Sequence, residues 1–163
     1  MIKYIISGGA GFIGSHLVEV LVKKKKNVVV LDNLSTGRIE NIRPFLKNIK
    51  FIKCDISKKG KWEREIKGKC YVFHLAAESR IQPTIERPQM ACQVNFIGTC
   101  NVLEATRKYA KENARVMYSS TSSGYGLANK WPLKESMKRD CLNPYSVAKV
   151  AGEDLCKMYY TLY

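Results

Sequence analysis

The sequence predicts an α/β fold in which helices cover both faces of a doubly wound parallel sheet. Short runs of β-branched and other apolar residues recur along the chain without polar alternation, which is typical of strands buried on both faces. These runs alternate with segments of helical character, and a glycine-rich turn directly follows the first run. Such alternation favours right-handed crossovers, with a ligand site at the carboxyl ends of the strands.

The expected elements follow from these patterns in chain order. Strands are predicted at residues 2–7, 27–32, 48–55, 70–77 and 114–120. Helices are predicted from Phe12 to about Lys25, around 38–47, 57–67 and 89–112, and from Pro144 to the last residue. Asn27 stands where a residue of left-handed backbone often ends a helix. The longest irregular stretch is 121–143, and long loops in compact domains are often functional.

Composition places the chain among one-domain globular proteins, and we expect one domain over 1–163. No apolar run approaches the roughly 20 residues of a membrane span, and the first residues lack a signal-peptide pattern. The six cysteines form no C-x-x-C pair and no cluster with histidine. This argues against a metal site or a disulfide framework and predicts reduced thiols in the cytoplasm.

The net charge is the unusual feature of the composition. Lys and Arg number 28 against 14 Asp and Glu, a net charge of +14, which makes nucleic acid a partner to consider. The lysines are scattered over expected helix faces, however, and no basic stripe is interleaved with aromatic residues. A solvated, lysine-rich surface is the favoured interpretation, and no nucleic-acid or membrane partner is expected.

The turn after the first strand has the composition of a phosphate-binding loop. Gly8, Gly11 and Gly14 are spaced G-x-x-G-x-x-G between a strand and a helix, where glycine permits a tight turn and close approach to a pyrophosphate. Asp32 ends the second strand, near the spacing of an acid that accepts adenosine ribose hydroxyls. Together they predict a Rossmann-type dinucleotide site that prefers NAD, with Arg38 keeping NADP as a minority alternative.

The stretch NPYSVAK places a phenol beside an amine. Tyr145 and Lys149 are four residues apart and therefore share one face of the last helix. A free phenol has a pKa of about 10 and is a poor base at neutral pH. The neighbouring ammonium favours the phenolate, so the pair is a candidate acid–base group rather than a chance pair on an exposed helix.

Several motifs in a fixed order extend this interpretation over the whole chain. They are GGAGFIG, LDNLSTG, CDI at 54–56, HLAA at 74–77, VNFIGTCNVLEA at 94–105, YSSTSSGYG at 118–126 and PYSVAK. In this order they resemble the extended short-chain dehydrogenase/reductase superfamily, in particular its NAD-dependent nucleotide-sugar epimerases and dehydratases, and among these the UDP-glucose 4-epimerases. The resemblance covers residues 2–163.

The resemblance implies a role for each matching residue. The catalytic residues would be Thr121, Tyr145 and Lys149. Cofactor binding would involve Gly8, Gly11, Phe12, Ile13, Gly14, Asp32, Asn33, Ser35, Thr36, Gly37, Asp55, Ile56, Leu75, Ala76, Ala77, Asn95, Ser119, Tyr145 and Lys149. Glu78 and Arg80 follow the fourth strand, and a sugar contact and a local ion pair are about equally expected there. His74 is expected to be a buried core histidine.

Two departures from the family pattern bear on the reaction. The family's dehydratases carry an acid pair after the catalytic Ser or Thr, whereas Ser122 and Ser123 follow Thr121 here. Dehydration would therefore lack its acid and base. Gly124 replaces an apolar residue before Tyr125, which loosens the loop without removing a reactive group.

The resemblance implies a UDP-glucose/UDP-galactose 4-epimerase that works by transient oxidation at C4 of the sugar. Tyr145 would take the hydroxyl proton while NAD takes the hydride, which then returns to the opposite face. Other nucleotide sugars stay open as substrates. The family's C-terminal substrate domain has no counterpart in these residues, so a dinucleotide-binding module with little turnover is the alternative. A homodimer through helices near 89–112 and 144–162 is expected by analogy.

Overall fold

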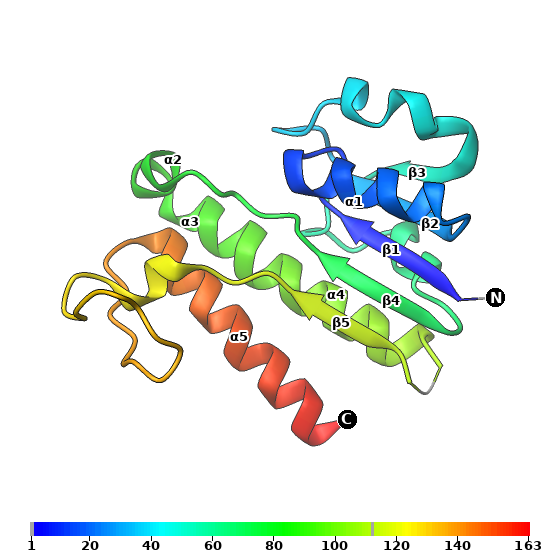
Figure 1. Cartoon of the computed structure of the whole chain (residues 1–163). Helices are drawn as coiled ribbons and strands as arrows, with labels where there is room; N and C mark the ends of the chain where they lie inside the picture. Colours follow the sequence, from blue (N-terminus) through cyan, green and yellow to red (C-terminus); the bar gives the residue numbers. More distant parts are fainter. Residues whose placement is uncertain (1, 112) are drawn as a thin grey trace.

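A computed structural model describes residues 2–111 and 113–163, and its centre is a five-stranded parallel sheet in the order β3-β2-β1-β4-β5 (Figure 1). The strands are β1 (Lys3–Ser7), β2 (Asn27–Asp32), β3 (Ile49–Lys53), β4 (Cys70–His74) and β5 (Arg115–Tyr118). The helices are α1 (Phe12–Lys23), α2 (Ile81–Glu86), α3 (Pro88–Ala91), α4 (Gly98–Tyr109) and α5 (Pro144–Leu162). This strand order is the doubly wound arrangement of the Rossmann fold, so the predicted fold class is confirmed.

The absence of alternation in the strands follows from the two faces of the sheet. Ile5 is in register with Val29 and Val72, and this row packs on the side of α4. The next row, from Ile6 and Val30, packs on the side of α1. Because both rows are buried, successive positions of a central strand are apolar and the alternation disappears.

Helices on each side complete the layers. Val18 and Leu21 bring α1 against one face, and Val102 and Ala105 bring α4 against the other. Helix α5 packs beside α4, and Figure 1 shows α4 passing behind β5 with α5 next to it. No helix among the described residues has the length and apolar character needed to cross a membrane.

Three predicted helices were wrong in type or extent. The 38–47 segment forms two 3-10 helices, Ile39–Asn41 and Arg43–Asn48, and 57–67 is helical only at Lys61–Glu65, also as 3-10. The 89–112 segment consists of α3, a π-helix at Cys92–Ile97 and α4, and its last residue lies outside the described residues. Helix α2 was not predicted. Prolines explain part of this, since Pro44 and Pro88 begin helices and interrupt longer ones.

The end of α1 also differs from the prediction. Lys25, not Asn27, has the left-handed backbone, with φ of 53°. The Lys25 N–H donates to the carbonyl of Val22 (2.8 Å) and the Lys26 N–H to that of Leu21 (3.0 Å), which is the Schellman pattern. Asn27 is thereby free to begin β2, in register with Lys3.

The predicted strands extend too far at their carboxyl ends. The structure ends β3 at Lys53, β4 at His74 and β5 at Tyr118, two or three residues before the predicted limits of 55, 77 and 120. The residues beyond each end leave the sheet and form loops at its carboxyl edge. Those loops form much of the candidate site.

Candidate cofactor and acid–base site

One cavity of about 500 Å³ lies at the carboxyl edge of the sheet. Of the predicted site residues, those that line it are Gly8, Gly11, Phe12, Ile13, Gly14, Asp32, Asn33, Ser35, Thr36, Gly37, Asp55, Ile56, Leu75, Ala76, Ala77, Ser119, Tyr145 and Lys149. The loops after β1, β2, β3, β4 and β5 all contribute to this lining, together with the start of α5. The parallel topology therefore brings together segments that are far apart in the sequence.

The glycine loop packs so closely against neighbouring backbone that side chains would not fit at two of its positions. Gly8 has φ of +75°, and a Cβ there would lie 2.7 Å from the backbone nitrogen of Ala76. A Cβ on Gly14 would collide with the carbonyl oxygen of Gly8. Helix α1 begins next to this loop at Phe12, with no side-chain cap and no acidic residue in its first turn. Its first backbone N–H groups and its positive dipole end can therefore receive an anionic ligand.

Asp32 joins the glycine loop to the loop after β2. One carboxylate oxygen accepts from the Ala10 N–H (2.9 Å) and the other from the Leu34 N–H (2.8 Å), and the residue is buried. Each carboxylate oxygen can accept more than one hydrogen bond, so Asp32 retains acceptor capacity toward the cavity that it lines. The carboxylate thus holds the loop and can also hold a ligand hydroxyl.

A buried polar network supports the loop after β4. His74 contacts the Ser7 hydroxyl through Nδ1 (2.6 Å) and the Thr99 hydroxyl through Nε2 (2.9 Å). The predicted cofactor residue Asn95 does not line the cavity. Its side chain instead accepts from the Glu78 N–H (2.8 Å) and donates to the Glu78 carbonyl (3.0 Å), which holds the loop from behind. With both ring nitrogens hydrogen-bonded to buried hydroxyl groups, His74 is the core histidine that the sequence predicted.

Helix α5 carries Tyr145 and Lys149 to the cavity wall. Asn143 caps its start, accepting from the Ser146 N–H at 2.8 Å, and Pro144 is in the first turn. Lys149 is only 4% exposed, and burial lowers its pKa to about 8. Its Nζ lies 4.2 Å from the centroid of the Tyr118 ring, an arrangement in which the ring face attracts the cation. The ammonium is mostly protonated at neutral pH and loses its charge as the pH rises past about 8.

The three polar residues after β5 take different places. Ser119 and Ser120 line the cavity, whereas Thr121 is not among the lining residues. The Thr121 hydroxyl accepts from the Ser123 N–H (3.1 Å) and caps the short 3-10 helix Ser122–Tyr125. Ser120 was not among the predicted site residues, although it stands between two of them in the sequence. Adjacency to Ser119 was the available signal, and the turn of the backbone decides which hydroxyl reaches the cavity.

Other lining residues had weaker signals. Leu31, Cys54, Ser79 and Val94 also line the cavity and were not predicted as site residues. Arg80 lines the cavity as well, and no Glu78–Arg80 ion pair is present in the described part of the chain. This placement favours the ligand-contact interpretation of Arg80. Within 2–111 and 113–163, no group of three metal-ligating side chains is found.

Comparison with known proteins agrees with this geometry. The family model described as GDP-mannose 4,6 dehydratase matches residues 5–163. UDP-glucose 4-epimerase of Mycolicibacterium smegmatis is 36% identical over 169 residues, which cover 99% of this chain and 52% of that protein.

Two solved structures are similar over nearly the whole chain. The UDP-N-acetylglucosamine 4-epimerase from Methanobrevibacter ruminantium, in complex with UDP-N-acetylmuramic acid, has a TM-score of 0.90 at 34% identity, covering 99% of this chain and 51% of that one. The UDP-glucose 4-epimerase of Thermus thermophilus, in complex with NAD, has a TM-score of 0.87 at 33% identity, with the same coverage of 99% and 51%. The chain thus spans about half the length of these relatives. Because the family match begins within β1 and continues to the last residue, the chain belongs to the NAD-dependent epimerase/dehydratase family of the extended short-chain dehydrogenase/reductases.

Proposed function

We propose that this chain binds NAD in the cavity at the carboxyl edge of the sheet and supplies the acid–base group of a nucleotide-sugar 4-epimerase. The observation that carries the proposal is the convergence of the glycine loop, Asp32 and the Tyr145–Lys149 pair on one cavity. Neither the loop nor the pair is specific alone. Because all of them line the same cavity, a single dinucleotide could contact the glycine loop and Asp32 at one end and the Tyr145–Lys149 pair at the other.

The residues fit a dinucleotide of the NAD type. The first turn of α1 would hold the pyrophosphate through its uncapped backbone N–H groups, and the glycine loop, which carries no side chains at Gly8 and Gly11, would let the pyrophosphate approach. Asp32 would accept the adenosine ribose hydroxyls, and its charge would repel a 2′-phosphate. Arg38, the residue that kept NADP open, is exposed and does not line the cavity. This arrangement favours NAD over NADP.

Tyr145 would move the proton in the reaction. Its phenol would take the proton of the sugar 4-hydroxyl and later return it, with the Lys149 ammonium favouring the phenolate. Bound NAD would supply the redox chemistry by accepting and returning hydride at C4 of the sugar. The serines at 122 and 123 offer neither the acid nor the base that elimination of water needs. An epimerase acting on a UDP-sugar is therefore favoured over a dehydratase.

The cofactor part of the proposal is tested by titrating NADH into the protein and following its fluorescence. We expect saturable binding, weakened about ten- to hundredfold in Asp32→Asn because a charge-assisted hydrogen bond to the ribose is lost. Glu40→Gln is the matched control, since Glu40 pairs with Arg43 on the surface and does not line the cavity. Absence of NADH binding to the unaltered chain would contradict the proposal.

The catalytic part is tested by conversion of UDP-galactose to UDP-glucose in the presence of NAD. Tyr145→Phe should lower the rate about a hundredfold or more, because general acid–base groups contribute at least that much. Thr121→Ala belongs in the same series, since its hydroxyl caps a 3-10 helix and a catalytic role for it stays a prediction.

A second candidate function is a dinucleotide-binding module with little turnover. The chain spans about half the length of its relatives, and binding energy from remote parts of a substrate normally drives the chemical step. NADH binding without turnover of any UDP-sugar would favour this second candidate. Turnover of UDP-N-acetylglucosamine but not of UDP-galactose would support the proposed epimerase reaction with a different nucleotide sugar as the substrate.

A further inference from the structure

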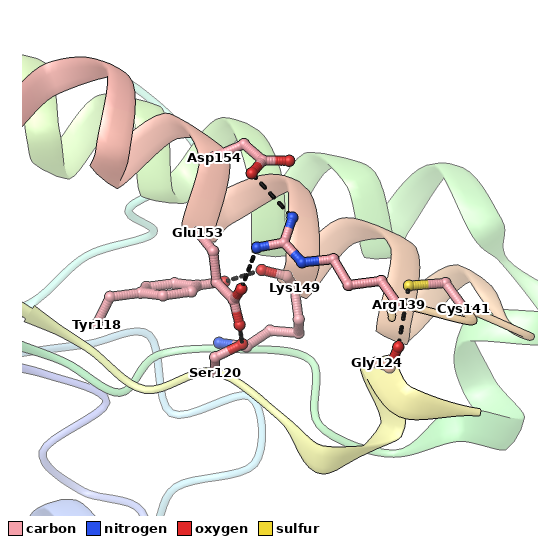
Figure 2. Close-up of polar contacts among 8 residues, drawn as sticks. All are labelled: Tyr118, Ser120, Gly124, Arg139, Cys141, Lys149, Glu153 and Asp154. Atoms are coloured by element: carbon pink, nitrogen blue, oxygen red, sulfur yellow. Dashed lines mark hydrogen bonds and ion pairs between the residues drawn. The ribbon is translucent and has the colours of Figure 1, made fainter. Parts of the chain in front are cut away.

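Two carboxylates of α5, Glu153 and Asp154, pair with Arg139, and Glu153 also contacts Ser120 at the cavity. The Arg139 guanidinium donates to Glu153 (2.6 Å) and to Asp154 (2.9 Å), bridging two neighbouring carboxylates of the helix. The other oxygen of Glu153 accepts from the Ser120 hydroxyl. Figure 2 shows the Glu153 side chain joined by dashed lines to Ser120 on one side and Arg139 on the other. Glu153 therefore connects a surface arginine to a residue of the cavity wall.

The arginine comes from a loop segment that is itself held in place. Next to Arg139, Asp140 donates its N–H to the Gly124 carbonyl (2.8 Å). The Asp140 carboxylate accepts from the N–H groups of Leu127 (3.0 Å) and Ala128 (2.9 Å). The guanidinium thus approaches Glu153 from a segment tied to the loop after β5, and it can restrict the carboxylate to the orientation that meets Ser120.

A serine hydroxyl has one proton to give and two lone pairs. Because the Ser120 proton is directed to Glu153, only the lone pairs remain for a ligand in the cavity that Ser120 lines. We propose that Glu153 is a positioning residue of this site: it makes Ser120 a hydrogen-bond acceptor toward a hydroxyl or amide N–H of the bound ligand, and Arg139 holds Glu153 in that orientation. The inference rests on the proposed function only in taking the ligand to be the dinucleotide.

Glu153 is also placed to act on Lys149, which precedes it by one helical turn. The groups that face Lys149 are Tyr145, Glu153 and Cys156 of α5, Tyr118 of β5 and His74 of β4. Burial lowers the Lys149 pKa to about 8, and Cys156 and then Glu153 oppose that effect. Since His74 is neutral and the other groups are weak acids, Glu153 is the carboxylate that favours the ammonium from this side.

The positioning role is tested by a double-mutant cycle in NADH binding. Ser120→Ala and Glu153→Gln should each raise the dissociation constant about fivefold to tenfold, the effect of one hydrogen bond. The double variant should be no weaker than Ser120→Ala alone, because Glu153 acts through the hydroxyl. Ser120→Thr, which keeps a hydroxyl, should bind NADH about as well as the unaltered chain does. Asp154→Asn is the matched control: it loses the other half of the Arg139 pair, does not touch Ser120 and should bind as the unaltered chain does.

A readout without cofactor separates this inference from the proposed function. In protein labelled with ¹³C at lysine Cε, the Lys149 titration midpoint should fall below about 8 in Glu153→Gln and stay in place in Asp154→Asn. Additive losses in the cycle would overturn the action through Ser120. An unmoved Lys149 midpoint in Glu153→Gln would overturn the action of Glu153 on the site, and this measurement does not depend on NADH. Failure of the unaltered chain to bind NADH would refute the proposed function instead.

Discussion

The hydrogen-bond partners of His74 determine which of its two ring nitrogens carries the proton. The Thr99 hydroxyl donates to the Asn95 carbonyl (2.7 Å), so its oxygen must accept from His74 Nε2–H. Nδ1 is then the acceptor of the Ser7 hydroxyl proton, and the Ser7 oxygen accepts from the Ala76 N–H (3.4 Å). Every member of the network is satisfied only with a neutral imidazole. Complete burial, together with the nearby Lys149 charge, lowers the His74 pKa from 6.5 to about 3.

We expect His74 to make the fold acid-sensitive. The unfolded chain binds a proton on this residue below about pH 6.5 and the folded protein only near pH 3, so stability falls as the pH decreases through this window. The full effect is about 4 to 5 kcal/mol. Urea unfolding between pH 7 and 4 measures most of it, and His74→Gln should flatten the slope. A ¹⁵N spectrum showing a protonated or Nδ1–H imidazole at pH 6 would contradict the assignment.

At the scale of elements, α5 must approach the sheet closely to place its reactive side chains. The Tyr118 hydroxyl donates to the Lys149 carbonyl at 3.0 Å, so the helix backbone lies against the aromatic ring. Gly152 makes this approach possible, because a Cβ there would collide with the Tyr118 hydroxyl and lie 2.7 Å from Cζ. The same packing buries Lys149 and lowers its pKa.

Gly152→Ala is therefore expected to destabilise the protein. Alanine improves helix propensity by about 1 kcal/mol, but displacing Tyr118 or α5 should cost about 1 to 3 kcal/mol. The net loss is measured by urea unfolding at pH 7. Combining the change with Tyr118→Leu, which shortens the opposing side chain, should recover part of the loss. A Gly152→Ala variant more stable than the unaltered chain would show that the helix does not approach as closely as described.

At the scale of the whole molecule, we propose the homodimer that the family resemblance implies, through helices near 89–112 and 144–162. Helices α4 and α5 already pack against each other within the chain, and α5 leaves several apolar or aromatic side chains exposed. These are Val147, Met158, Tyr160 and Leu162, with Tyr160 90% exposed. Exposed apolar side chains of this kind are suited to an association between copies.

Sedimentation equilibrium at micromolar concentration should give twice the 18.5 kDa of one chain. Because each protomer carries a net charge of +14, association should strengthen as salt screens the repulsion. Tyr160→Glu should shift the equilibrium toward monomer, whereas Lys47→Glu, an exposed change away from these helices, should not. A monomer at every salt concentration would count against the dimer.

Local patterns were enough to predict the sheet, the glycine loop, Asp32 and the Tyr145–Lys149 pair. Each depends on short-range rules: unbroken apolar runs for strands buried on both faces, glycine where a Cβ would collide, and four-residue spacing on one helical face. These signals are local, so they are visible in the chain before it folds.

Features that depend on contacts between distant segments could not be predicted in this way. Ser120 rather than Thr121 lines the cavity, because the backbone turns after β5 and Thr121 caps a 3-10 helix. Asn95 lies behind the cavity wall and supports the loop after β4. The link from Arg139 through Glu153 to Ser120 joins residues up to 33 positions apart, and no periodic pattern in the sequence encodes such a pairing.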